Sequence, residues 1–142
     1  MKEIYILGVR LNPLTIDELN GFISRTIKCQ KRIVIAGQNM HGIFFYHSDK
    51  RRRVYLDHAD IVRIDGMALL FWAKLLGYPL SIEHRVTYVD WVHPLMATAE
   101  AEGWRVFYLG GKPGVAARAA RKLQERYPRL VIRTHHGYFT PE

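Results

Sequence analysis

The chain has 142 residues, of which 49% are hydrophobic and 24% charged, a composition typical of a globular protein and not of a disordered one. Its 21 Lys and Arg against 13 Asp and Glu give a formal net charge of +8. This charge favours an anionic partner, such as a nucleic acid, an acidic membrane face or a phosphorylated small molecule. The single cysteine, Cys29, excludes a disulfide within the chain. No apolar run reaches the ~18 residues of a membrane-spanning helix, so we expect one cytosolic domain.

Strands and helices are expected to alternate along the chain. Apolar, β-rich runs predict strands at 3–9, 33–36, 61–64, 105–109 and 130–133. Apolar residues at helical spacing predict helices at 15–29, after 40, and at 50–59, 67–76, 89–101 and 115–127. This alternation predicts an α/β fold, a Rossmann-like parallel sheet flanked by helices.

Several helix ends carry recognisable signals. Thr15 and Glu18 have the spacing of a capping box at the start of the first helix. Gly77 suits the position just after a helix end, whereas Pro94 interrupts the helix 89–101 or marks the first turn of a new one. The helix 67–76 is apolar on nearly all sides, so it is either central in the core, which we expect, or exposed to a membrane or a partner.

Asp65 stands directly after the buried run 61–64 and directly before a new helix. Ligands of α/β proteins gather at the carboxyl ends of the strands, which makes this carboxylate a candidate for catalysis. Aspartate is also a favoured N-cap residue. The local sequence leaves both interpretations open.

Asn39, Arg85 and the pair Gly110-Gly111 are further candidates for ligand binding. The Asn39 amide could hydrogen-bond a sugar hydroxyl or a nucleobase. Alternatively, Asn39 is a turn-forming residue. The Arg85 guanidinium can bind phosphate in a bidentate manner, although a surface arginine is the common case. The two glycines lie where a strand turns into a helix, a geometry that suits phosphate but that many turns adopt for packing alone.

Other kinds of site are weakly supported. The run Lys50–Arg53 is typical of a solvated helix face, and it could also contact lipid phosphates. His135 and His136 are adjacent, which is poor spacing for two ligands of one metal, so no metal site is predicted. A Gly-x-Ser-x-Gly elbow is absent and Cys29 has no local partner, which argues against a nucleophilic triad.

Taken together, three stretches resemble the WecG/TagA/CpsF family of bacterial glycosyltransferases. They are ADIVRIDGMALLFWAKLLGYPL, HRVTYVDW and GWRVFYLGGKPGVAARAARKLQERYPRLVIRTHHGYF, and the resemblance extends from about Ile4 to Phe139. It implies an inverting, metal-independent enzyme without a cofactor. Such an enzyme moves a hexose or N-acetylhexosamine, of the N-acetylmannosamine type or glucose, from a UDP-sugar. The implied acceptor is a polyprenyl-diphosphate-linked saccharide of surface or exopolysaccharide biosynthesis.

The resemblance also implies roles for individual residues. Asp65 would be the general base, Asn39 would lie in the substrate pocket and Arg85 near the diphosphate, while the Gly110-Gly111 turn is of the right type to stabilise the leaving UDP. The enzyme would be cytoplasmic and peripheral on the inner face of the cell membrane. Whether it forms a homo-oligomer is left open.

The sequence departs from the family pattern at two positions and at its end. Gly37 stands where the family usually has a threonine, and Tyr88 stands where it usually has a glycine. Family proteins run further at the C-terminus, so we expect residues 1–142 to be a single α/β domain that lacks this part. The alternative function is a non-catalytic basic α/β module or an inactive fragment that contacts nucleic acid or membrane, although no nucleic-acid motif supports it.

Overall fold

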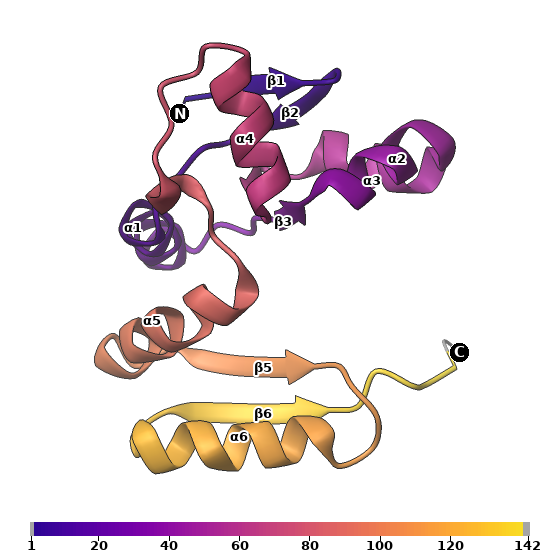
Figure 1. The fold of residues 1–142 in the computed structure, drawn as a ribbon. Helices are drawn as coiled ribbons and strands as arrows, with labels where there is room; N and C mark the ends of the chain where they lie inside the picture. Colours follow the sequence, from indigo (N-terminus) through magenta and orange to yellow (C-terminus); the bar gives the residue numbers. More distant parts are fainter. Residues whose placement is uncertain (1, 141–142) are drawn as a thin grey trace. The chain divides into compact units, whose positions relative to one another are not determined.

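The computed structural model describes residues 2–140, which form two compact units. The first ends at Trp91 and the second begins at Val92, so the boundary falls within a helix. The fold is mixed α/β (Figure 1). The strands are β1 (Ile4–Ile6), β2 (Val9–Leu11), β3 (Ile35–Gln38), β4 (Ile61–Ile64), β5 (Arg105–Leu109) and β6 (Val131–His135). The helices are α1 (Ile16–Lys28), α2 (Met40–Ser48), α3 (Lys50–His58), α4 (Met67–Leu75), α5 (Tyr88–Ala101) and α6 (Val115–Arg126), with a 3₁₀ turn η1 (Ile82–His84).

In the first unit, β3 and β4 form a parallel pair in which Ile35 lies opposite Ile61. The helices α2 and α3 connect the two strands and lie side by side as a hairpin (Figure 1). Asn12 joins the end of β2 to β4, because its backbone N–H donates to the carbonyl oxygen of Val62 at 2.7 Å and its Oδ1 accepts from the Val62 N–H at 2.9 Å. The apolar faces of β1, β2, β4 and α4 share one buried core.

The N-terminal run forms a hairpin, so the prediction of one strand at 3–9 was wrong. β1 and β2 are antiparallel, with Ile6 opposite Val9. The two residues between them, Leu7 and Gly8, both have positive φ angles, 50° and 77°. That geometry matches the right-handed twist of two hairpin strands and reverses the chain within two residues.

Two predicted helix features have different outcomes. The capping box of α1 is confirmed, since the Thr15 hydroxyl accepts from the Glu18 N–H at 3.3 Å and a Glu18 carboxylate oxygen accepts from the Thr15 N–H at 2.8 Å. The predicted break at Pro94 is wrong, because α5 runs through this residue without interruption.

Helix α4 is buried on one side only, so the prediction of a helix buried in the core is confirmed for one face and wrong for the other. Leu69 and Leu70 are buried, whereas Met67, Phe71 and Leu75 are 56%, 66% and 65% exposed. The exposed residues follow one another at a spacing of four, so they share one helix face. The sequence shows that α4 has apolar residues on nearly all sides. It does not show which of these sides packs against the rest of the first unit.

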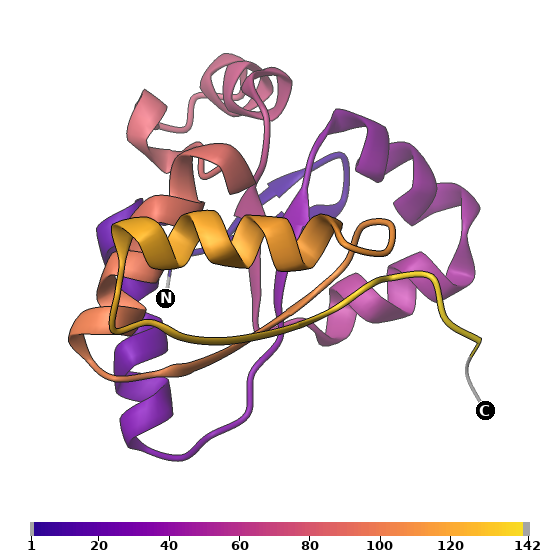
Figure 2. The same cartoon turned by 90° about the horizontal axis from the view of Figure 1, so that it is seen from below.

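The second unit is built from β5, α6 and β6, with the end of α5. β5 and β6 are parallel, with Arg105 opposite Val131 and Leu109 opposite His135. α6 runs along this pair (Figure 2). Residues of α5, α6 and the turn before β6 form a separate small core, which contains Met96, Ala99, Tyr127 and Leu130.

Candidate active site

At the carboxyl edge of the β3–β4 pair, the backbone segments that contain three of the predicted site residues lie side by side. Asn39 follows β3, Asp65 follows β4, and the Asp65 N–H donates to the carbonyl oxygen of Gln38 at 2.7 Å. A parallel β-bridge between Ile64 and Arg85 places the segment that contains Arg85 beside the end of β4. Asn39 and Asp65 therefore follow two neighbouring strands, where α/β folds bind ligands, and Arg85 lies in a third backbone stretch that is bridged to the last residue of β4.

Asp65 does not cap helix α4. The N-cap residue is Gly66, with φ at 142°, and no side chain bonds the first turn. A φ of this value is one that glycine adopts readily, so Gly66 allows the sharp change from strand to helix. The Asp65 side chain is 30% exposed and its Oδ2 lies 3.5 Å from Nη1 of Arg63. Of the two interpretations left by the sequence, capping is wrong, and the carboxylate stays accessible to a ligand.

Asn39 is the N-cap of α2. Its Oδ1 accepts a hydrogen bond from the Gly42 N–H at 2.8 Å, which confirms the turn-forming role that the sequence offered. A Cβ atom on Gly66 would lie 3.6 Å from the Asn39 Cβ, so this side chain lies beside the residue that follows Asp65. The Nδ2 hydrogens of Asn39 are the donors that a ligand at this edge could use.

Arg85 pairs with Asp90, its Nη2 lying 2.8 Å from Oδ2 of the carboxylate. The Thr87 hydroxyl donates to the same oxygen at 2.7 Å, and the buried Nε of Arg85 has no hydrogen-bond partner among the described residues. The guanidinium is thus held by one carboxylate and retains further donors. A phosphate could bind it in place of Asp90 or beside it.

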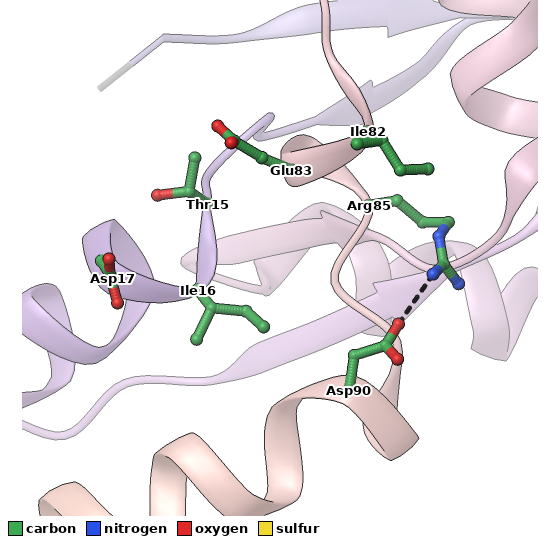
Figure 3. A pocket seen from close by; sticks show the side chains of 7 residues that line it. All are labelled: Thr15, Ile16, Asp17, Ile82, Glu83, Arg85 and Asp90. Atoms are coloured by element: carbon green, nitrogen blue, oxygen red, sulfur yellow. Dashed lines mark hydrogen bonds and ion pairs between the residues drawn. The ribbon is translucent and has the colours of Figure 1, made fainter.

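A pocket of about 410 Å³ lies around Arg85 (Figure 3). It is formed by the start of α1, η1 and the start of α5, and its lining residues are Thr15, Ile16, Asp17, Ile82, Glu83, Arg85 and Asp90. Three carboxylates against one guanidinium make this pocket a poor site for a diphosphate. Because Asn39 and Asp65 do not line it, we place the candidate active site at the strand edge and not in this pocket.

Arg63 is a candidate site residue that the sequence analysis missed. It lies on β4, is 5% exposed, and is the charged neighbour of Asp65. Residues two apart on a strand face the same side, so a charged residue within the apolar run 61–64 was a signal that could have identified it.

Gly110 and Gly111 belong to the second unit, so their predicted role beside Asp65 stays a prediction. Their φ angles are 153° and 69°. The Gly110 N–H donates to the carbonyl oxygen of His135 at 3.0 Å, and the Gly111 carbonyl oxygen accepts from the Gly137 N–H at 2.9 Å. A Cβ on Gly137 would lie 3.2 Å from the Gly110 Cα. These glycines allow the turn after β5 to pack closely against the loop after β6.

Two further properties concern the described residues 2–140. His, Cys, Asp and Glu side chains there do not gather in a group of three or more that could hold a metal ion. None of the helices in this range has the length and hydropathy needed to cross a membrane.

A family model described as Glycosyl transferase WecG/TagA/CpsF family matches residues 4–142. The match includes both units and all the site residues named above. It agrees with the resemblance of the three sequence stretches. The chain therefore belongs to the WecG/TagA/CpsF family of glycosyltransferases.

Proposed function

We propose that this glycosyltransferase of cell-surface polysaccharide biosynthesis uses Asp65 as the general base of an inverting, metal-independent transfer from a UDP-sugar. One observation carries the proposal. The Asp65 carboxylate stands at the carboxyl edge of a parallel strand pair, partly exposed, and is not used as a helix cap. An accessible carboxylate at this edge is what a proton transfer from a sugar hydroxyl requires.

Inverting transfer is a single displacement. Asp65 takes the proton of the acceptor hydroxyl while that oxygen forms a bond to the anomeric carbon, and the bond from this carbon to the UDP oxygen breaks. A positioned base of this kind contributes about 10² to 10⁴ in rate. Because the entering oxygen attacks opposite to the leaving group, the configuration at the anomeric carbon inverts.

The leaving UDP gains negative charge and needs donors to stabilise it. Arg85 can supply a guanidinium only if it leaves Asp90 and the other carboxylates of its pocket, and the Gly110-Gly111 turn is the second candidate. The Asn39 Nδ2 group is suited to a sugar hydroxyl or the uracil ring. In this scheme Asp65 performs the proton transfer, and the other residues bind and orient the donor.

The proposed acceptor is a polyprenyl-diphosphate-linked saccharide at the inner face of the membrane. The net charge of +8 and the exposed run Lys50–Arg53 on α3 suit an anionic surface. Phe44 on α2 and Phe71 on α4 are 65% and 66% exposed, and exposed aromatic rings of this kind suit a membrane interface.

The experiment offers the chain UDP-N-acetylmannosamine, UDP-N-acetylglucosamine and UDP-glucose with a short-chain polyprenyl-diphosphate-linked saccharide. We expect UDP release, a product heavier by one sugar, and an inverted anomeric configuration by NMR. UDP should also raise the melting temperature of the chain, since it binds the folded state. Salt-dependent binding to generic DNA, without transfer and without stabilisation by UDP, would instead support the non-catalytic alternative.

A further inference from the structure

Arg63 has a buried guanidinium that is held from several sides. Its Nη1 lies 3.5 Å from Oδ2 of Asp65 and donates a hydrogen bond to the carbonyl oxygen of Val86. Its Cζ lies 5.7 Å from the ring centre of Tyr88 and 5.5 Å from that of Trp91. A carbonyl oxygen, two ring faces and one carboxylate thus fix the position of the group.

Position 37 provides the space for this guanidinium. Gly37 lies directly opposite Arg63 in the parallel register of β3 and β4. A Cβ atom on Gly37 would lie 2.8 Å from Nη2 and 3.0 Å from Cζ of Arg63, closer than van der Waals contact allows. The glycine that departs from the family pattern therefore leaves room for the arginine, and any side chain there would displace the guanidinium.

The Asp65 carboxylate is the counter-charge of the Arg63 guanidinium. A buried guanidinium is costly without a counter-charge, and the Asp65 carboxylate is the one that lies within 4 Å of it among the described residues. The Arg63 side chain is only 6% exposed, so it has little surface to offer a substrate. Arg63 can therefore act on the reaction through Asp65 and not by binding the donor.

We propose that Arg63 is a positioning residue for Asp65 and that Gly37 is the residue that admits it. The inference rests on the proposed role of Asp65 as the base. The guanidinium holds one carboxylate oxygen toward the sheet, so that the other faces the acceptor hydroxyl. A displacement of about 1 Å in such a group costs on the order of 10² in rate.

The experiment compares Arg63→Gln, Arg63→Lys and Gly37→Ala with a matched control, Arg10→Gln. Arg10 on β2 also donates to a backbone carbonyl oxygen, that of Ala59, and pairs with a carboxylate, that of Glu3 at 3.1 Å, away from the site. We expect Arg63→Gln to lower kcat by about 10²-fold with KM for the UDP-sugar unchanged. Arg63→Lys should restore part of the loss, Gly37→Ala should lower kcat although the arginine is present, and Arg10→Gln should leave kcat unchanged.

A second measurement does not depend on turnover. The ¹³C resonance of the Asp65 carboxyl group is assigned by its loss in Asp65→Asn. We expect it to shift in Arg63→Gln and in Gly37→Ala and to stay in place in Arg10→Gln. If the unmodified chain transfers no sugar, the proposed function fails, and this resonance still decides whether Arg63 holds Asp65.

Three results would overturn the proposal. They are an unchanged Asp65 resonance in Arg63→Gln, a loss of kcat equally large in Arg10→Gln, and a loss expressed in KM alone. If Arg63→Gln does not fold, Gly37→Ala decides alone, because it retains the buried arginine and shifts only its head group.

Discussion

Asn39 combines a structural role with a proposed binding role, and two substitutions separate them. Asn39→Asp keeps an oxygen that can cap α2, since Asn and Asp are about equal as N-caps. It replaces the amide donors with a negative charge. We expect its melting temperature to stay near that of the unmodified chain, while the KM for the UDP-sugar rises about tenfold.

Asn39→Ala is the companion variant, because it loses both the cap and the donors. Its free energy of unfolding should be about 1 kcal/mol lower than that of the unmodified chain, and its loss of donor binding should be similar to that of Asn39→Asp. Urea unfolding and initial rates provide both readouts. A normal KM in Asn39→Asp would contradict a binding role for the Asn39 amide.

At the residue scale, the sequence predicted Asp65 and Asn39 because each follows a predicted strand, and residues in such places meet at one sheet edge. Arg85 was predicted from the chemistry of its guanidinium and from the family resemblance. Arg63 was not predicted, because the partners that explain its burial, Val86 and Trp91, lie far along the chain. A charge inside an apolar strand shows that a partner is needed, but local periodicity does not identify it.

Among the elements, the α2–α3 hairpin contains a pH-dependent contact. The Tyr46 hydroxyl donates to Asp57 Oδ1 at 2.8 Å. This hydrogen bond raises the pKa of Tyr46 above its usual value of 10.0, and burial and the negative charge of Asp57 add to the rise. A raised pKa means that the contact stabilises the fold fully below pH 10 and is lost as pH rises through the folded-state pKa.

We therefore expect Tyr46→Phe to lower the free energy of unfolding by about 1 kcal/mol at neutral pH. The difference from the unmodified chain should disappear above the folded-state pKa. Urea unfolding at a series of pH values measures it, with Tyr55→Phe on the exposed part of α3 as the control. A difference that stays constant with pH would contradict the assigned hydrogen bond.

The exposed basic residues at the start of α3 test the proposed membrane contact. Lys50, Arg51 and Arg52 are exposed, and each basic residue near an anionic leaflet contributes about 1 kcal/mol. Replacing all three with Gln should lower partitioning to vesicles of equimolar phosphatidylglycerol and phosphatidylcholine by about 10²-fold. Arg53 is excluded because it bonds the carbonyl oxygens of Tyr46 and His47.

The matched control for the basic residues lies on α6, where Arg118, Arg121 and Lys122 are also exposed. Their replacement by Gln removes the same charge, and we expect a much smaller loss in a co-sedimentation assay. Equal losses from both sets would show a general effect of charge and would contradict a membrane surface at α3.

At the element scale, periodicity and caps predicted the existence and type of most helices and strands. The β1–β2 hairpin was missed, because its two-residue turn contains Leu7 in an uncommon positive-φ conformation. The exposed face of α4 was missed for a different reason. An apolar helix surface in a sequence does not specify what covers it.

At the scale of the whole molecule, family membership rests on residues 4–142, whereas the proposed chemistry rests on one edge of the first unit. The order of motifs along the chain was enough to recognise the family. It could not show whether the Gly110-Gly111 turn reaches Asp65, because that depends on contacts between units and not on local pattern. The central claim therefore concerns Asp65.

The most direct measurement compares sugar transfer by Asp65→Asn with that by Asp60→Asn. Asp60 precedes the same strand and its Oδ2 accepts from the Val34 N–H at 2.8 Å, at the opposite end from the candidate site. We predict that Asp65→Asn loses at least about 10² in kcat while UDP still raises its melting temperature, and that Asp60→Asn transfers sugar normally. A folded Asp65→Asn variant that transfers sugar at the rate of the unmodified chain would contradict the assignment of Asp65 as the base.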